Sequence, residues 1–561
     1  MIRLSRMGPP RLTFSASPLP SSSPSSSHFN PRLGCLTLQR DDATKSTIKI
    51  ATPGLLTTAS RGFIPHLSRD HVNSTAAIRW VNIPFETFLE RVPPVPTTLK
   101  DSLHPLHDFF KYDTSKHIVC LQARDPIDSR DMPSNGRDHL SVRCIRGVRK
   151  LRISDWNFYA SSTYPDVVVA LSDIPFTPPP HSQKRINKSL ERSTQWLLDS
   201  LSPVPPNPED RPNLLVHLVG GINPSARQAF SQALTETLFG AEAHRVKPLK
   251  NLDDAITGYT FDLVPLRKAL KWDTAADNTL VHLIQTSLES LPFGKPRIVN
   301  SVRGPQDILR LISATGVDLF DSQWAVELAT FGVALDFTFP VPSSPTGPPL
   351  TRIRDNGKTD IGHNLYDGKY ATDFNRLSTL FLDGQSKSST PTPTSVTATK
   401  QRWCPCAACS PVSPLIQLKH SQTDEHVPDP SIPLEYRPAY TRAYIHHLLH
   451  THEMSAHALL TMHNLSVVDH FFADILDTLE RDGVDKFVQE VRKFRDWYDD
   501  DVVGDDTEDL GEAGEVEVAG GILGREAKSD WVSVDKARGK GRLAREKEKT
   551  GTAVLEEAEV V

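Results

Sequence analysis

The sequence predicts an α/β fold, namely a TIM (β/α)8 barrel with an embedded C-terminal zinc-binding subdomain. Two observations support this prediction. Strand-like and helix-like segments alternate over about 250 residues, which is the length and pattern of a parallel barrel. Farther along, three cysteines lie within six residues, at Cys404, Cys406 and Cys409, and a histidine-rich run follows them. An open doubly wound sheet is the alternative fold for the same alternation.

The alternation is clearest in the middle of the chain. Residues 167–176 form an apolar run that predicts a buried strand, and residues 186–201 carry apolar side chains at helical spacing. Residues 213–221 repeat the strand and end in a glycine turn, and the helix that follows is predicted to close at Gly240. The pattern continues with strand regions at 255–266 and 295–302, a helix at 305–316, and a strand and a helix within 317–332.

The N-terminal segment, residues 1–47, is of low complexity and is predicted to lie outside the folded core. Its first 40 residues contain five arginines, many serines and no Asp or Glu, which is the composition of a mitochondrial transit peptide. Its prolines argue against a long amphipathic helix, so a disordered N-terminus is the alternative. The foldable sequence is expected to begin at Ile48.

The remaining chain divides into three parts. Residues 48–402 are predicted to form the barrel domain with loop insertions, and residues 403–497 the zinc-binding subdomain with C-terminal helices. Residues 410–437 are expected to be an inserted loop. Residues 499–561 begin with ten acidic residues up to position 517 and end in a Lys/Arg-rich stretch, so they are predicted to be a disordered charged tail.

Composition favours a reducing compartment. Six cysteines in 561 residues are too few for a disulfide scaffold, and no apolar run approaches the roughly 18 residues that span a bilayer. We therefore expect a cytoplasmic protein without an integral membrane segment, with some mitochondrial association if the N-terminus is a transit peptide. The formal net charge of −5 does not indicate nucleic-acid binding, although it is compatible with a local basic face.

The cysteine cluster predicts a zinc site. A Cys-x-Cys-x-x-Cys hairpin supplies three thiolates at short range, and tetrahedral Zn²⁺ then needs one more ligand. The alternative is three incidental cysteines. The histidine-rich run offers six candidates for the fourth ligand, and chemistry alone does not decide between them: His446, His447, His450, His452, His457 and His463.

Several motifs resemble the tRNA-guanine transglycosylase (queuine tRNA-ribosyltransferase) family. CPCAACS at 404–410 and TRAYIHHLLHTHEMSAHALLTMHNL at 441–465 are similar to the zinc-binding C-terminal part of that family. TPGLLTTASRGFIPHL at 52–67 resembles its opening segment, and residues 295–322 resemble the stretch that ends in its nucleophilic aspartate. The resemblance spans residues 48–497. Through TPGLLTT, PHL and KYATDFNRL, it is nearest to the accessory subunit of the eukaryotic enzyme.

The resemblance implies a TIM barrel with one structural Zn²⁺ per subunit. Its ligands would be Cys404, Cys406, Cys409 and, as the histidine of the family's terminal His-Asn pair, His463. It also implies that Asp321 occupies the position of the family's nucleophile. That group attacks the ribose when guanine is exchanged for queuine at wobble position 34 of tRNAs with GU(N) anticodons (Asp, Asn, His, Tyr).

This chain departs from several of the family's catalytic motifs, which predicts that it has no catalytic activity of its own. The motif Asp-Ser-Gly-Gly-Phe-Gln, which carries the second aspartate, has no counterpart. The base-binding turns are replaced by Val219-Gly220-Gly221, without the glutamine, and by Phe261-Asp262-Leu263. Asp173 lies near the family's base-recognition aspartate. We therefore expect no catalytic residue, with Asp321 as a relic of the nucleophile.

The main hypothesis is a non-catalytic accessory subunit. It would form a heterodimer with a catalytic queuine tRNA-ribosyltransferase subunit and help that subunit to bind tRNA. The resemblance implies that the zinc-containing region forms the dimer interface. One alternative is an active tRNA-guanine transglycosylase that uses Asp321 as its nucleophile, and the other is a zinc-stabilised barrel with an RNA-binding or scaffold role unrelated to queuine.

Overall fold

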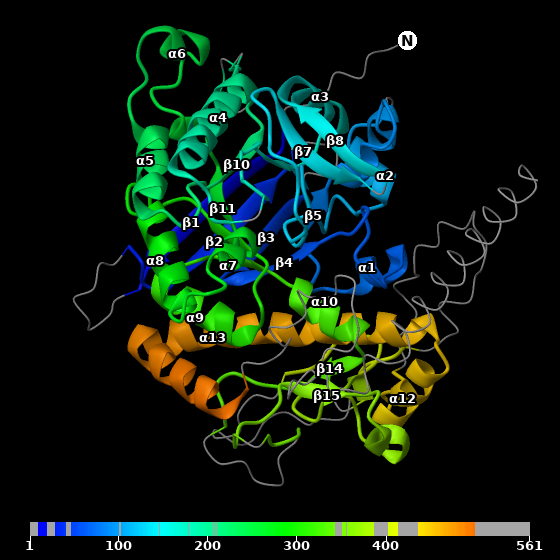
Figure 1. The fold of residues 1–561 in the computed structure, drawn as a ribbon. Helices are drawn as coiled ribbons and strands as arrows, with labels where there is room; N and C mark the ends of the chain where they lie inside the picture. Colours follow the sequence, from blue (N-terminus) through cyan, green and yellow to red (C-terminus); the bar gives the residue numbers. More distant parts are fainter. Residues whose placement is uncertain are drawn as a thin grey trace, which may run out of the picture.

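The computed structural model describes residues 9–19, 28–40, 46–342, 351–385, 402–412 and 436–499, apart from nine further positions between 100 and 355. The predicted tail beyond residue 499 and most of the predicted inserted loop at 410–437 lie outside the described residues. The described chain forms a barrel surrounded by helices, with a smaller layer on one side (Figure 1).

Eight parallel strands close the barrel, and their order around it follows their order along the chain. The last strand pairs with the first through Phe320 and Leu55. This closure confirms the predicted TIM barrel and excludes the open sheet. The strands are β4 (Gly54–Thr58), β5 (Trp80–Pro84), β6 (Ile118–Gln122), β9 (Val167–Val169), β10 (Asn213–His217), β11 (Gly258–Asp262), β12 (Arg297–Asn300) and β13 (Leu319–Asp321).

Helices ring the barrel and cover its strands (Figure 1). The longest of them in this ring, α4, buries Trp196, Leu197 and Leu198 on one face and exposes charged residues on the other. The helices are α1 (Arg69–Ser74), α2 (Pro105–Phe110), α3 (Ile153–Thr163), α4 (Gln183–Leu201), α5 (Pro224–Thr235), α6 (Gly240–Arg245), α7 (Leu263–Ala269), α8 (Ala276–Leu288), α9 (Pro305–Thr315) and α10 (Gln323–Thr330).

Several element boundaries differ from the sequence prediction. Residues 263–266, predicted within a strand region, instead begin α7. The strand predicted over 167–176 already ends at Val169, and a loop follows it. Gly240 does not close a helix, because the chain leaves α5 earlier and the Leu238 amide donates to the Lys250 carbonyl (2.9 Å). Gly240 instead begins α6, with a φ of 58°.

The N-terminal segment is folded where the structure describes it, which corrects the prediction that folding begins at Ile48. Strands β1 (Arg11–Pro18), β2 (Arg32–Gln39) and β3 (Thr47–Thr52) form an antiparallel sheet. Its apolar face packs into the end of the barrel where the strands begin and so closes that end. The sheet contributes Leu12, Leu36, Leu38, Ile48 and Ile50, and the barrel contributes Leu56, Trp80, Ile118, Cys120, Val167, Leu215, Ile298 and Leu319.

Two buried arginines fasten this sheet to the barrel. Arg32 on β2 forms an ion pair with Asp318, which directly precedes β13. Arg40 follows β2 and pairs with Asp166, which precedes β9, at 2.5 Å. All four side chains are 0–1% exposed. Arg32 also donates to the Lys295 carbonyl (2.9 Å), so its charge is compensated by several partners rather than by one.

The chain after the barrel adds a layer built around one long helix. Strands β14 (Val333–Leu335) and β15 (Gly362–Asn364) form a small antiparallel sheet, and α12 (Arg442–His450) precedes α13 (Met454–Trp497). Helix α13 is kinked at Gly483, where φ is 75°. It contacts α9, α10, β4 and β14, and lies between the barrel and the β14–β15 layer (Figure 1).

The remaining short elements connect these parts. A hairpin of β7 (His139–Cys144) and β8 (Gly147–Arg152) lies between β6 and α3. Four 3-10 turns complete the described elements: η1 (Glu86–Phe88), η2 (Val95–Thr98), η4 (Asp253–Ala255) and η5 (Gly368–Thr372).

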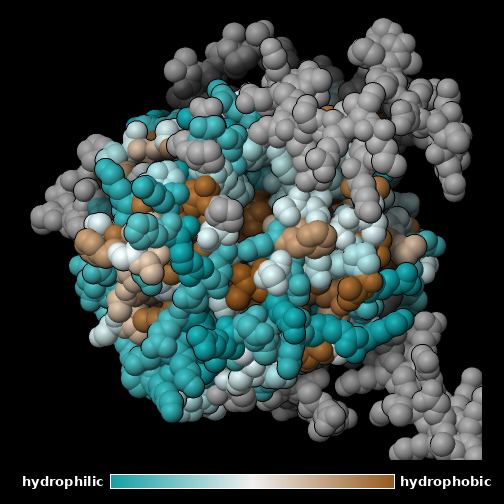
Figure 2. All heavy atoms as spheres, turned by 90° about the horizontal axis from the view of Figure 1, so that it is seen from above, coloured by the Kyte–Doolittle hydropathy of each residue, from teal (hydrophilic) through white to brown (hydrophobic). Residues whose placement is uncertain are grey.

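On the face seen from above, where α3 and α4 lie, apolar residues form small separate patches between hydrophilic ones (Figure 2). Among the described residues, no helix combines the length and the apolar character needed to cross a membrane.

The buried ion pairs predict how the N-terminal sheet contributes to stability. Replacing Arg32 by Met leaves Asp318 buried without its cation, so we expect the free energy of unfolding to fall by about 3–5 kcal/mol in urea denaturation. Lys49→Met on β3 is the matched control, because Lys49 is exposed, and should change that free energy by less than about 0.5 kcal/mol. Equal effects of the two substitutions would contradict the assigned role of Arg32.

Candidate metal site and barrel mouth

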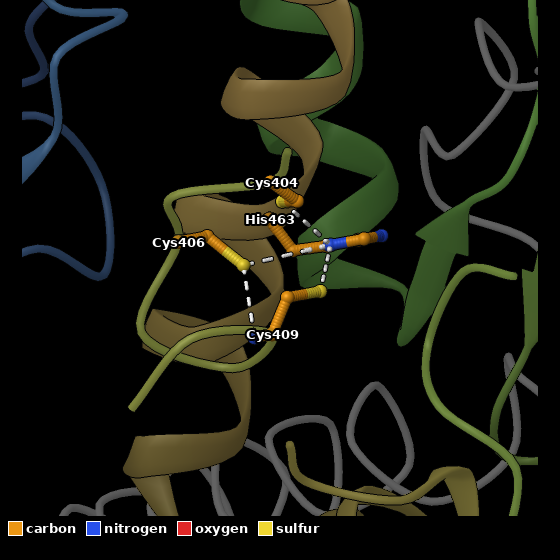
Figure 3. Close-up of side chains that lie close together, drawn as sticks. All are labelled: Cys404, Cys406, Cys409 and His463. Atoms are coloured by element: carbon orange, nitrogen blue, oxygen red, sulfur yellow. Dashed lines mark hydrogen bonds between the residues drawn. The ribbon is translucent and has the colours of Figure 1, made fainter. Parts of the chain in front are cut away.

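The four predicted metal ligands meet in the interior of the C-terminal layer. The ligand atoms of Cys404, Cys406, Cys409 and His463 all lie within 4.8 Å of one another, and all four residues are buried. Their side chains point toward a common centre (Figure 3). The distances from the three Sγ atoms to His463 Nδ1 are 4.0, 3.7 and 3.4 Å in chain order.

This arrangement fits a tetrahedral metal ion. Zn–S bonds of about 2.3 Å and Zn–N bonds of about 2.0–2.1 Å place a sulfur and a nitrogen about 3.6 Å apart at the tetrahedral angle. The observed separations bracket that value. Three thiolates and an imidazole are also the donor set that Zn²⁺ prefers in closed structural sites. The cluster could therefore hold a metal without leaving a position for substrate.

Local hydrogen bonds shape the cysteine loop before any metal enters. The Cys409 amide donates to Cys406 Sγ (3.3 Å), and the Ser410 hydroxyl donates to the Cys404 carbonyl (2.7 Å). Burial opposes ionisation of Cys406, but hydrogen bonds from its neighbours in the cluster lower the pKa of this thiol well below its usual range. A thiolate at Cys406 is the form that binds a metal.

Helix α13 positions the fourth ligand through two consecutive residues. The second ring nitrogen of His463, Nε2, lies 2.9 Å from the Leu335 carbonyl, so an Nε2–H donor leaves the Nδ1 lone pair for the metal. Asn464 accepts from the Leu335 amide (2.9 Å) and donates to the carbonyls of Ala325 and Val333 (both 3.0 Å). Asn464 thus holds the strand whose carbonyl orients His463.

The other histidines of the run do not reach the cluster. His446, His450 and His457 use a ring nitrogen to contact the carbonyls of Leu365, Tyr366 and Ala329, respectively. His447 and His452 are exposed. The structure therefore selects His463 among the six candidates.

Asp321 ends β13 at the mouth of the barrel, but it is sealed from solvent. One carboxylate oxygen accepts the Ser301 amide (2.8 Å) and the other accepts the Val302 amide (3.1 Å). The side chain is fully buried, and burial raises the pKa of Asp321 to about 7. It lines neither of the two cavities described below.

Asp173 is bound in a buried ion cluster. Arg185 forms hydrogen bonds with its carboxylate at 2.6 and 2.9 Å, Arg192 at 3.1 Å and Asn135 at 2.6 Å. The side chain is not exposed at all. These contacts leave Asp173 a structural role, so it does not face a ligand at the barrel mouth.

The glycine turn after β10 borders the larger of two cavities at the mouth. Gly220 and Gly221 have φ values of 128° and 58°, which confirms the predicted turn. The buried Arg227 donates from Nε to the Gly221 carbonyl (2.7 Å) and fixes the turn. The cavity has a volume of about 750 Å³, and His217 and Asp262 also line it. This volume lies within the range of roughly 300–1,000 Å³ that is usual for ligand pockets.

The centre of the mouth, by contrast, is nearly filled. The Arg124 guanidinium lies 3.4 Å from the centre of the Phe176 ring, and Asn300 donates to Asp262 (2.9 Å). The space that these residues leave is about 50 Å³, enough for only a few water molecules. A nucleobase does not fit there.

Sequence reasoning missed several groups at this mouth. Glu86 is buried and accepts the amides of Asp125 (2.9 Å) and Arg143 (3.0 Å); burial raises its pKa to about 7. His217, at the end of β10, contacts Thr260 (3.0 Å). These residues could have been predicted from the sequence. Polar residues at or just after the end of an apolar barrel strand lie at the C-terminal face of the barrel.

A closed parallel barrel with a buried Cys3His cluster that could hold a metal defines a member of the (β/α)8 barrel class. The chain belongs to the queuine tRNA-ribosyltransferase family, whose model matches residues 28–496. The match begins at residue 28, within the part of the N-terminus that the sequence prediction left out, and it includes the strands β2 and β3.

Similar proteins carry the name "Queuine tRNA-ribosyltransferase accessory subunit 2". The relative from Schizosaccharomyces pombe is 24% identical over 80% of this chain and 79% of its own length. The relative from Aedes aegypti is 23% identical over 83% of this chain and 90% of its own length. The relative from Gallus gallus is 23% identical over 78% of this chain and 89% of its own length.

The hydrogen bonds of Asn464 predict a measurable effect on the metal site. Asn464→Ala frees the β14 backbone and with it the carbonyl that orients His463, so we expect the affinity for Zn²⁺ to fall by about 10- to 100-fold in competition with a chelator. His447→Ala, an exposed histidine of the same run, should leave that affinity unchanged. If both variants keep the affinity of the original chain and its circular dichroism, Asn464 does not support the site.

Proposed function

We propose that this chain is the non-catalytic accessory subunit of a queuine tRNA-ribosyltransferase. In this proposal it forms a heterodimer with the catalytic subunit and supports that subunit in binding the tRNA whose wobble guanine is exchanged for queuine. The family membership and the names of the relatives support the assignment to this enzyme complex.

The single observation that supports the absence of catalysis is the state of Asp321. A carboxylate nucleophile must be ionised and must reach the anomeric carbon of the substrate. Here both oxygens accept backbone amides, the side chain is buried, and its raised pKa favours the protonated form up to near neutral pH. The filled centre of the mouth supports the same conclusion, because a base cannot approach Asp321 through it.

The proposal assigns the metal site to assembly rather than to the reaction. The cluster lies in the C-terminal layer, and its four ligands leave no open position on a tetrahedral ion. We propose that the ion is Zn²⁺, one per chain, and that it stabilises the surface formed by the cysteine loop, α12 and α13. The ion would be held by Cys404, Cys406, Cys409 and His463, and it would cross-link the cysteine loop to α13.

The first test concerns catalysis. Purified chain, purified catalytic subunit and the mixed pair are each given tRNA and labelled guanine. We expect incorporation by the pair and none above background by this chain alone. Asp321→Asn, which keeps the size of the side chain, should leave the activity of the pair unchanged because Asp321 does not touch the substrate.

A different result of this test would contradict the proposal. Incorporation by this chain alone that disappears in the Asp321→Asn variant would establish the alternative, an active transglycosylase with Asp321 as nucleophile. Ser313→Ala, a substitution on the exterior helix α9, is the control for general effects of substitution.

The second test concerns the metal. Cys404→Ser combined with Cys406→Ser removes two thiolates, so we expect the zinc content to fall from one ion per chain to none by atomic emission, and pairing with the catalytic subunit to be lost in size-exclusion chromatography. Cys35→Ser, outside the cluster, should change neither quantity. A metal-free double variant that still pairs would refute the role of the ion in assembly.

A further inference from the structure

The β7–β8 hairpin carries a concentration of positive charge. Residues 139–154 contain five cations and no Asp or Glu. Along β8 every side chain except Leu151 is exposed. The exposed cations Arg146, Arg149, Lys150 and Arg152 therefore project from a short two-stranded sheet that lies in front of the barrel strands (Figure 1).

Within the described part of the chain this charge is only weakly compensated, by Glu90 near Arg146 and by Asp138, whose pKa Arg152 helps to lower. Arg146 lies 4.0 Å from Glu90 and is 77% exposed, so that pair is weak. Arg149, Lys150 and Arg152 form no salt bridge with any described carboxylate. A run of unpaired cations on one strand produces a local positive potential even in a chain whose net charge is −5.

The hairpin is held rigidly against the barrel mouth. The buried carboxylate of Glu86 accepts the Arg143 amide (3.0 Å), and Cys144 Sγ lies 3.0 Å from the Glu86 carbonyl. The Arg143 guanidinium donates to the Asp131 carbonyl (3.0 Å). Asp131 in turn lines the large cavity and pairs with Lys268 (2.6 Å). The loop at Asp131 therefore connects β7, the strand paired with β8, to the wall of the cavity.

The same cavity is also lined by an exposed aromatic side chain. Trp272 lines the cavity and is 88% exposed, which is unusual for tryptophan. Lys271 lies 5.6 Å from the centre of the Trp272 ring and forms no salt bridge with a described carboxylate. An exposed ring beside a free cation offers stacking to a base and charge to a phosphate.

We propose that β8 and the Lys271-Trp272 corner form an RNA-binding surface on this chain. The cations of β8 contact the phosphate backbone, and Trp272 stacks on an unpaired base at the rim of the cavity. This inference rests on the proposed function and deepens it, because it assigns residues of this chain to contact with the tRNA. Single-stranded loops are the parts of RNA whose bases are free to stack in this way.

The combination of features favours RNA over other anionic partners. A lipid surface would be bound by cations together with apolar side chains that insert beside them, but β8 exposes only one apolar side chain, Val148, at 39%. The cavity that the Asp131 loop lines, by contrast, has the size of a ligand pocket and includes the exposed Trp272 in its lining. RNA offers phosphates for the cations of β8 and bases for the aromatic ring of Trp272, so it matches both parts of the surface.

The test removes the three unpaired cations at once. Arg149→Gln, Lys150→Gln and Arg152→Gln are combined in the full chain, paired with the catalytic subunit, and tRNA binding is measured at several salt concentrations. We expect affinity to fall by roughly 10- to 100-fold at low salt and the slope of log K against log salt to fall by about 2 to 3, because about 0.7–0.9 counterions are released per contact.

A matched control separates this surface from general charge effects. Lys49→Gln, Lys116→Gln and Lys247→Gln change the net charge equally, but they lie at exposed positions outside the β7–β8 hairpin and do not line the cavity. We expect this control to bind as the original pair does. If the control weakens binding as much as the β8 variant, or if the β8 variant binds normally, the surface is refuted. Thermal melting of both variants excludes unfolding as the cause.

Two further measurements complete the test. Trp272→Ala should weaken binding of an anticodon-loop RNA by about ten-fold without changing the salt slope, and an unchanged affinity would refute the stacking contact. Binding of vesicles that contain phosphatidylserine, lost in the β8 variant while tRNA binding is kept, would assign the surface to membranes instead.

The outcomes also distinguish this inference from the proposed function. If the original pair forms and exchanges guanine while the β8 variant binds tRNA normally, only the surface is refuted. If this chain does not pair with the catalytic subunit, yet binds tRNA through β8 on its own, the surface stands and the proposed function fails.

Discussion

The C-terminal layer depends on one hydrogen bond, from His463 to the Leu335 carbonyl. The imidazole of His463 faces the three cysteines with one ring nitrogen and the Leu335 carbonyl with the other. It therefore connects the cysteine loop with strand β14. Asn464 is the next residue of the helix and ties the same strand to α10 through the Ala325 carbonyl. A metal bound at His463 would therefore stabilise α13, β14 and the cysteine loop as one unit.

The two ends of the barrel are closed by different chemistry. At the end where the strands begin, an apolar sheet fills the opening, and the buried ion pairs of Arg32 and Arg40 satisfy the carboxylates there. At the other end, the carboxylates of Asp321 and Glu86 are satisfied by backbone amides instead. Amide donors do not leave when the side chain ionises or accepts a proton, so these groups act as fixed structural anchors for the loops that they hold.

Much of the fold could be predicted from the sequence, because parallel strands buried on both faces appear as apolar runs and their helices as periodic ones. The N-terminal sheet could not: Arg32 and Arg40 are charged residues with buried partners more than 100 positions away in the chain. The cysteine cluster was evident from its spacing, whereas His463, 54 residues from Cys409, was identified only through the family resemblance. The ion cluster of Asp173 required knowledge of which face of α4 packs against its loop.

The net charge of the whole chain does not describe the local charge of its surface, for a related reason. The value of −5 includes the ten acidic residues between 499 and 517, far along the chain from the cations of the β7–β8 hairpin. Three of the acids near that hairpin are already paired with other residues: Asp131 with Lys268, Asp128 with Arg130, and Asp138 with His139. Since screening in salt limits the reach of a charge to about 10 Å, a partner that approaches β8 responds to the unpaired cations of that strand and not to the sum over 561 residues. Local pairing, not composition, therefore decides which face of this barrel attracts an anion.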